Sequence, residues 1–225
     1  HCISSAASDV YKRQDRRFLH MAGSILGFFT LNMAPANNWR IPEHYHADWT
    51  PDPDYSGDPM FRPPGTTPGH SLEFARLLLQ YWDLSGREDE RLPAAARNLV
   101  DRALSDGWNE KLGGLAYTMD AQGQVAIGKR LWWPVTEGIG ALASLIKLAP
   151  TESDEMWYRR LWSFSEETLI DHAYGGWYPE LDDEGKPTDG TFKGKPDLYH
   201  SLQATLYPLV DGISRQRQGL LRLAV

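Results

Sequence analysis

Apolar residues recur at steps of three and four along most of the chain, which is the spacing of one face of an α-helix. On this basis the sequence predicts helices over residues 15–33, 67–85, 92–105, 136–148, 153–172 and 198–214. The second of these has the clearest start, because Thr67 suits the N-cap position and Pro68 suits the first helical position.

Two segments between the helices have the features of β-hairpins instead. Gly114–Thr118 and Val125–Ile127 are extended runs separated by turn-forming residues, and Gly176–Leu181 leads in the same way into Asp182–Lys186. Short hairpins are therefore expected at these places in an otherwise helical chain.

The hairpins and helices belong to an internal repeat. Gly113–Gly114 and Gly175–Gly176 lie 62 positions apart (175 minus 113), and each pair opens a hairpin. The segment His70–Glu73 recurs as His200–Gln203, 130 positions later (200 minus 70), with Thr136–Gly138 at the corresponding place between them. The repeating unit is about 65 residues long and contains an inner helix, an outer helix and a hairpin.

Helix pairs of this kind must stack on one another, because a single pair cannot bury its apolar faces. Six pairs close into an (α/α)6 barrel, and this chain supplies about three. The predicted fold class is all-α: a partial (α/α)6 barrel over residues 15–214, with short β-hairpins between the repeats. Residues 1–14, which lack an initiating Met and an apolar period, are interpreted as a non-native leader, and residues 215–225 as a tail.

Composition narrows the range of partners. The 225 residues carry a net charge of −7 and no basic patch, which argues against nucleic acid. The most apolar stretch, residues 21–34, is too short to span a bilayer, so no membrane partner is expected. The single cysteine excludes a disulfide within the chain and agrees with a cytoplasmic location. A homo-oligomer is left open.

His70 is the first candidate for chemistry, because it lies in the first turn of its predicted helix. Glu73 follows three residues later on the same side, where it could fix the ring in one tautomer or bind a substrate hydroxyl. The positive end of the helix dipole disfavours an imidazolium and would keep His70 a neutral base. The alternative is a histidine that only satisfies the helix end.

His200 has the same place at the start of a later helix, with Gln203 in the position of Glu73. Equivalent sites of a repeat share one end of a barrel, so both imidazoles are expected around one pocket. Two bases around one pocket are what proton transfer next to a carbonyl requires.

Trp132, Trp133 and Glu137 stand at the corresponding place of the middle repeat. Aromatic faces and a carboxylate suit the binding of a monosaccharide, with stacking and hydrogen bonds to hydroxyl groups. Two core tryptophans and an ordinary first-turn glutamate would give the same pattern.

Other polar residues give weaker signals. Arg62, in a proline-rich loop before His70, could contact substrate or pair with an acid. His44 and His46 form a His-x-His pair, but no third ligand stands near them in the sequence, so no metal site is predicted.

Six segments taken together resemble the N-acylglucosamine 2-epimerase superfamily, and within it the mannose isomerase and sulfoquinovose isomerase branch. Each segment alone is a weak signal, but the ordered set is specific, and the resemblance extends over about residues 30–210. The segments are Trp39–Tyr45, Phe61–Pro63, Thr67–Glu73, Trp132–Glu137, Gly175–Trp177 and Lys195–His200.

The resemblance implies an (α/α)6 barrel that uses no metal or redox cofactor, with His70 and His200 as an acid/base pair. It implies aldose–ketose isomerisation of the mannose-to-fructose type through a cis-enediol. His200 would transfer the proton between C1 and C2, and His70 would open the sugar ring or return a proton. Glu73 would fix His70, while Trp133 and Glu137 would line the sugar site.

The chain departs from the family pattern at two points. Pro64 stands where the branch usually has an aromatic residue, and the family's N-terminal half carries an arginine and a further histidine that nothing here replaces. Three alternatives stay open: a 2-epimerase acting on N-acylglucosamine or cellobiose, an (α/α)6 glycoside hydrolase using Glu73 and Glu137 as its two carboxylates, and an inactive sugar-binding fragment.

Overall fold

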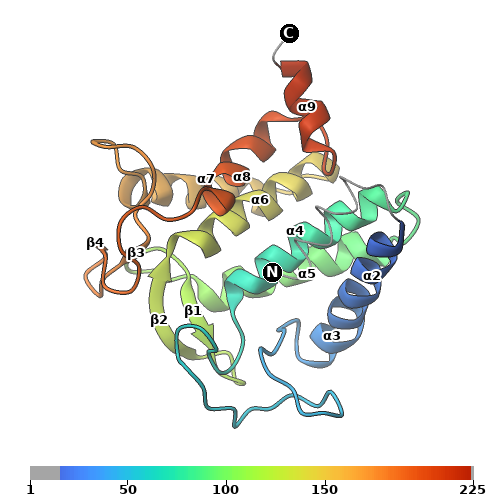
Figure 1. Ribbon diagram of the computed structural model, residues 1–225, viewed down its shortest axis with the longest axis horizontal. Coiled ribbons are helices and arrows are strands. Elements are labelled where there is room, and N and C mark those ends of the chain that lie inside the picture. Colours follow the sequence, from blue (N-terminus) through green and yellow to red (C-terminus); the bar gives the residue numbers. More distant parts are fainter. Residues whose placement is uncertain (1–15, 224–225) are drawn as a thin grey trace.

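The computed structural model describes residues 16–223 (Figure 1). The predicted leader, residues 1–14, lies outside the described residues. The described part is rich in helix, as the sequence predicts. Its helical elements are α2 (Arg16–Gly27), the π-helical η1 (Phe28–Met33), α3 (Ala34–Ala36), α4 (Pro68–Leu84), α5 (Arg91–Gly107), α6 (Trp132–Leu148), α7 (Glu152–Phe164), the π-helical η2 (Ser165–Leu169), α8 (Leu198–Leu206), the 3-10 turn η3 (Tyr207–Leu209) and α9 (Gln216–Leu223).

The predicted hairpins are present and combine into one sheet. The strands are β1 (Ala116–Met119), β2 (Val125–Leu131), β3 (Glu180–Leu181) and β4 (Pro187–Thr188). They form an antiparallel sheet in the order β1-β2-β3-β4. The pairing of Leu131 with Glu180 joins the two hairpins, which the sequence did not predict. The repeats are therefore connected through the sheet as well as through their helices.

Helix α6 lies at the centre of the described residues. It packs against α4, α7 and α8, while α5 packs on α4 (Figure 1). Every residue from Pro134 to Leu145 is buried, so the helix is enclosed on all its faces. Such a helix occupies the interior of a protein, and its neighbours cover it with apolar side chains such as Leu72 and Leu161.

Several predicted helix boundaries are wrong for identifiable reasons. Helix α6 begins at Trp132, before residue 136, because Pro134 is tolerated in a first turn, where its missing N–H has no partner to lose. The last long helix ends at Leu206 and continues only as the turn η3, short of residue 214. Pro208 removes an N–H donor there and its ring opposes further helix. The predicted tail contains the helix α9.

The turns before the two hairpins confirm the internal repeat. Gly113 and Gly175 donate their N–H groups to the backbone carbonyls of Asn109 and Asp171, respectively. The side-chain Oδ1 atoms of Asn109 and Asp171 each accept the N–H groups two and three residues further along. The φ angles of Gly113 and Gly175 are +71° and +76°, a conformation that glycine adopts readily. Both turns therefore have the same geometry and the same sequence requirement.

The two repeats differ in how each hairpin leads to the next inner helix. Strand β2 runs directly into α6, whereas residues 189–197 separate β4 from α8. We call residues 189–197 the α8 connection. It carries Phe192 and Lys195, and it gives this repeat a segment that the preceding one lacks.

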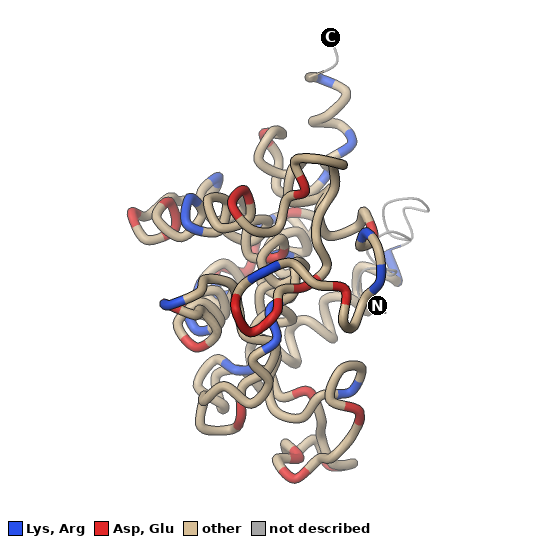
Figure 2. Tube along the Cα trace, turned by 90° about the vertical axis from the view of Figure 1, so that its left-hand side faces the viewer, with Lys and Arg blue, Asp and Glu red and all other residues tan. Residues whose placement is uncertain are grey.

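The surface mixes charge with some exposed apolar side chains. Basic and acidic residues alternate along the trace in Figure 2, without separation onto one side in that view. Helix α8 exposes Leu198 and Leu202, one turn apart, at 73% and 51%. Within residues 16–223, every helix is too short or too polar to span a lipid bilayer.

The helix starts show one confirmed signal and one that is wrong. Pro68 is the first residue of α4 and Thr67 is its N-cap, but the Thr67 hydroxyl is buried and makes no hydrogen bond within the described residues. At α8 the Asp197 side chain caps the helix by accepting from the Tyr199 N–H at 2.8 Å, and a reciprocal pair of capping bonds is present at α7. There the Thr151 side chain accepts from the Asp154 N–H at 3.1 Å, and the Asp154 carboxylate accepts from the Thr151 N–H at 3.0 Å.

This difference predicts unequal effects of the same substitution. Thr151→Val removes a working N-cap and should lower the free energy of unfolding by about 1 kcal/mol. Thr67→Val removes a hydroxyl that has no partner and should cost less than about 0.5 kcal/mol. Urea unfolding followed by circular dichroism measures both. Equal losses in the two variants would show that Thr67 does cap α4.

Candidate active site

A cleft of about 500 Å³ opens where α4, α6 and α8 begin. Six of the eight residues singled out in the sequence line it, namely Arg62, His70, Glu73, Trp132, Trp133 and His200. The others, Glu137 and Gln203, are buried behind its surface. The remaining lining residues are Glu43, His44, Met60, Phe61, Pro63, Tyr117, Phe192 and Tyr199.

The two candidate histidines are neighbours of one tryptophan. His70 is the third residue of α4 and His200 is the third residue of α8. The ring centroids of His70 and Trp133 are 5.1 Å apart, and those of Trp133 and His200 are 5.8 Å apart. The two imidazoles are thus at most 10.9 Å apart (5.1 plus 5.8 Å), in a single cleft.

A carboxylate orients the His200 ring. Nδ1 of His200 lies 2.7 Å from Oε1 of Glu137, whose side chain is 0% exposed. Because a carboxylate can only accept, Nδ1 carries the proton and donates it in this hydrogen bond. Within the described residues Nε2 has no hydrogen-bond partner, so it is the nitrogen left for a ligand in the cleft.

Glu137 is in turn held by a buried arginine. Nε of Arg76 donates to Oε2 of Glu137 at 2.6 Å, and the side-chain amide of Gln203 donates to Oε1. Burial raises the pKa of Glu137, but the charge of Arg76 and the hydrogen bonds from His200 and Arg76 outweigh it, so the pKa is lowered. Glu137 is therefore an ionised carboxylate with both oxygens occupied, and it lies behind the cleft instead of lining it.

His70 has a comparable partner, but not the one expected from the sequence. Its Nδ1 lies 2.8 Å from Oε1 of Glu43, which comes from the long loop before α4. Glu73 points instead toward Arg76, with 3.8 Å between its Oε1 and the Arg76 Nη2. A second carboxylate–imidazole pair therefore faces the cleft, again with Nε2 left free in the described residues.

The electrostatics of His70 also differ from the expectation. Burial lowers the pKa of His70, but the charge and hydrogen bond of Glu43, together with the charge of Glu73, outweigh it and raise the pKa. These carboxylates act against the effect predicted from the helix N-terminus, which favours a neutral ring.

Aromatic side chains form much of the cleft surface. Trp133 can lie across the start of α4 because residue 69 is glycine, where an added Cβ would be only 2.5 Å from the indole. The Phe192 ring packs edge-on against Trp132, with 5.7 Å between centroids, and brings the α8 connection to the cleft. The hydroxyl of Tyr117 donates to the carbonyl of Met60 and ties the loop before α4 to the sheet.

The remaining polar candidates have structural contacts. The Arg62 guanidinium lies over the Tyr55 ring at 5.7 Å, and His44 stacks on the same ring with its Nε2 3.0 Å from the carbonyl oxygen of Pro63. His46 lies 3.8 Å from Asp52 instead, so the two histidines of the His-x-His pair do not converge. Among the described residues no three His, Cys, Asp or Glu side chains are grouped to hold a metal ion.

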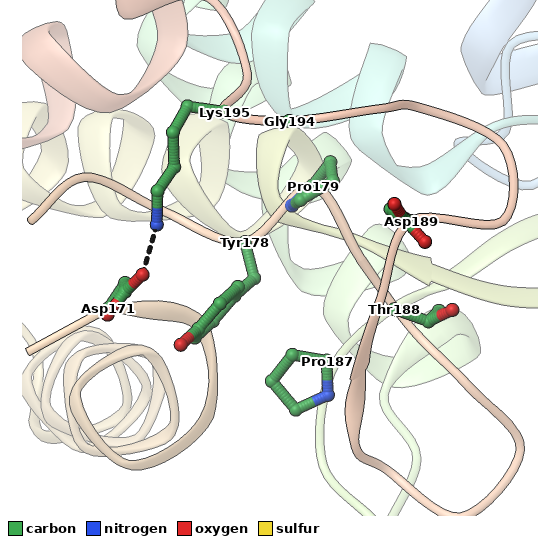
Figure 3. A pocket seen from close by; sticks show the side chains of 8 residues that line it. All are labelled: Asp171, Tyr178, Pro179, Pro187, Thr188, Asp189, Gly194 and Lys195. Carbon is green, nitrogen blue, oxygen red and sulfur yellow. Dashed lines mark hydrogen bonds and ion pairs between the residues drawn. The ribbon is translucent and has the colours of Figure 1, made fainter. Parts of the chain in front are cut away.

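A second, smaller cleft of about 360 Å³ lies beside the α8 connection and contains no histidine (Figure 3). Lys195 points across it to Asp171 and forms an ion pair, with its ammonium 4.7 Å from the centre of the Tyr178 ring. The hydrogen bond from Lys195 lowers the pKa of Asp171 to about 2. This ion pair anchors the α8 connection just before the helix that carries His200.

Sequence reasoning missed three important residues. Glu43 lies within the family segment Trp39–Tyr45, but its pairing with His70 depends on a loop that has no periodic pattern. Arg76 had a usable signal, because it lies four residues after Leu72 on the apolar side of α4. Phe192 lies in the α8 connection, which has no equivalent in the preceding repeat.

Comparison with known proteins agrees with this architecture. A model of the N-acylglucosamine 2-epimerase (GlcNAc 2-epimerase) family matches residues 6–204. The chain belongs to this family. It is 37% identical over 204 residues to a D-mannose isomerase of Pseudomonas cannabina pv. alisalensis and 37% identical over 201 residues to a D-mannose isomerase of Thermobifida fusca. These matches cover 87% of this chain and 49% of each relative.

The fold is likewise similar to that of a crystal structure of D-mannose isomerase. The TM-score is 0.84 at 31% sequence identity, over 92% of this chain and 54% of that one. This chain therefore spans about half the length of the D-mannose isomerases that it matches.

The His70 environment leads to a prediction for its titration. Glu43→Gln should lower the pKa of His70, because it removes both a nearby negative charge and an accepting carboxylate oxygen. Glu73→Gln should lower it less, because Glu73 acts on His70 by charge alone. NMR titration of the imidazole resonances measures both values. A larger effect of Glu73→Gln would restore the arrangement expected from the sequence.

Proposed function

We propose that this chain provides part of the active site of an aldose–ketose isomerase that interconverts D-mannose and D-fructose. The observation that carries the proposal is the pair of imidazoles in one cleft, each with Nδ1 bound to a carboxylate and Nε2 free in the described residues. The names of the similar proteins support this choice of sugar.

The proposed reaction needs one proton to leave C2 and one to reach C1. A base removes the C2 proton of the open-chain aldose while the C1 carbonyl oxygen gains a proton, which gives a cis-enediol. Loss of the O2 proton and protonation of C1 then give the ketose, with no net change in atoms or electrons. We assign the C1/C2 transfer to His200 and ring opening or proton return to His70.

The carboxylates give the two histidines defined tautomers. A base that must accept a proton through Nε2 needs its other nitrogen protonated, and Glu43 and Glu137 both favour that state. Trp133, which contacts both rings, is the surface on which the sugar would stack. Glu137 and Gln203 act behind the cleft on His200, and not on the sugar.

The geometry of the cleft does not distinguish an isomerase from a 2-epimerase, but it argues against a glycoside hydrolase. A 2-epimerase would use the same deprotonation at C2 and differ only in where the proton returns, so the product decides. A glycoside hydrolase needs two carboxylates facing the substrate. Glu137 is 0% exposed and has both oxygens bound, which argues against that use.

We also propose that the helices belong to an (α/α)6 barrel. The pairs α4–α5 and α6–α7 and the single helix α8 follow the repeating order of inner and outer helices. The exposed face of α8, with Leu198 and Leu202, is an apolar surface of the kind that a next helix pair would cover.

The test is the product formed from D-mannose in deuterium oxide. The chain should yield fructose that carries deuterium at C1, as expected for proton transfer through an enediol. His200→Asn should lower kcat by about 10²–10⁴-fold, the usual contribution of a general acid or base. His172→Asn is the control, because this histidine is exposed and outside the cleft.

Three outcomes would contradict the proposal. Glucose without fructose would indicate a 2-epimerase, and fructose formation at an unchanged rate in His200→Asn would remove His200 from the chemistry. A folded chain that forms neither sugar from mannose would favour the alternative of an inactive sugar-binding fragment over an isomerase.

A further inference from the structure

Arg76 is a charged residue in the interior of the described region. Its side chain is only 1% exposed, although it carries a full positive charge at any ordinary pH. It comes from α4, and it reaches the carboxylate of Glu137 on α6, which is itself 0% exposed. Burial of such a pair is costly, and its retention calls for a reason beyond packing.

The surroundings of Arg76 are built to hold its side chain in place. Its Nη1 and Nη2 atoms donate to the hydroxyls of Tyr207 at 3.2 Å and Tyr199 at 3.3 Å. Residue 140 on α6 is glycine, and an added Cβ there would be only 2.9 Å from Cδ of Arg76. The guanidinium is therefore held by hydrogen bonds to residues of α6, α8 and η3. The missing side chain of Gly140 leaves the space that the Arg76 side chain occupies.

The charges around the pair explain what Arg76 can do. Arg76 and Glu137 cancel each other, so the cluster of Arg76, Glu137 and a neutral His200 has no net charge. Without Arg76, an ionised Glu137 beside a neutral imidazole would be an uncompensated buried anion. Such a site takes up a proton, because burial disfavours net charge.

No other described group could replace this charge. Gln203, which also donates to Glu137, is neutral. Tyr199 and Tyr207 are phenols, which carry no positive charge in either protonation state. Glu73, 3.8 Å from Arg76, is a carboxylate and would add to the negative charge.

We propose that Arg76 is a positioning residue that keeps Glu137 anionic and His200 unprotonated at Nε2, although it does not reach the cleft. Arg76 acts through Glu137, whose two oxygens divide between Arg76 and His200. Its effect on proton transfer rests on the function proposed above, but its effect on the protonation of the Glu137–His200 pair does not.

The test reads the imidazole nitrogens directly, by long-range ¹H–¹⁵N NMR of the labelled chain over a range of pH. Signals of His200 are assigned by their loss in His200→Gln. In Arg76→Met, the Glu137–His200 pair should release its last proton at a higher pH than in the wild type. The proton concentration at that point should be lower by a factor of about ten or more. Arg76→Lys, which keeps the charge, should restore most of this difference.

A matched control separates this effect from general damage. Arg97→Met breaks the ion pair between Arg97 and Asp154, whose carboxylate is 2% exposed. Neither residue lines the cleft. It should leave the His200 titration unchanged. Gly140→Ala is a second variant that keeps every charge and displaces the Arg76 side chain, and it should shift the titration in the same direction by a smaller factor.

The outcomes are decisive in both directions. A His200 titration in folded Arg76→Met or Gly140→Ala that matches the wild type would overturn the proposal. An equal shift in Arg97→Met would also overturn it, because the effect would then be nonspecific. Failure of mannose isomerisation with a shifted titration would reject the proposed function and leave the role of Arg76 intact.

Discussion

The buried ion pair between Arg76 and Glu137 is the constraint on which the arrangement of the cleft depends. It connects the middle of α4 to α6, and Glu137 extends the connection to α8 through His200 and Gln203. Breaking one partner of such a pair leaves an uncompensated charge in the interior, which is strongly destabilising. The inner helices of three successive repeats are therefore held in register by one carboxylate, and the cleft lies directly above it.

The two histidines occupy equivalent places in the repeat, but their carboxylate partners come from different kinds of segment and have different environments. Glu137 is enclosed and balanced by a cation, whereas Glu43 comes from a loop and faces His70, whose side chain is 41% exposed. The carboxylates near His70 raise its pKa, and within residues 16–223 the charged partner of Glu43 is His70 and not an arginine. Two acid/base groups in unlike surroundings can hold different protonation states at one pH, which is what a reaction with both an acid and a base step requires.

Local pattern in the sequence was enough to predict the helices, the hairpins and the repeat, because apolar periodicity and paired glycines are local signals. Gly113 and Gly175 need positive φ angles, and that requirement is visible in the chain itself. The partner of His70 was not predictable in this way, since Glu43 and Glu73 are both plausible neighbours and only the path of residues 37–67 decides between them. The role of Glu137 was missed because first-turn position alone does not say whether a side chain points into the cleft or toward α4.

The cleft is lined partly by helix starts that recur in the repeat and partly by two connecting segments. The repeated helix starts supply His70, Trp133 and His200, and His200 is bonded to the buried pair of Arg76 and Glu137. The segments without a counterpart in the repeat, the loop before α4 and the α8 connection, supply Arg62 and Phe192. A substitution in these segments changes the shape of the cleft without disturbing Arg76 or Glu137. Pro64 lies in the first of them, next to the cleft residue Pro63 and in the same loop as Glu43, so its departure from the family pattern bears on the shape of the cleft beside His70.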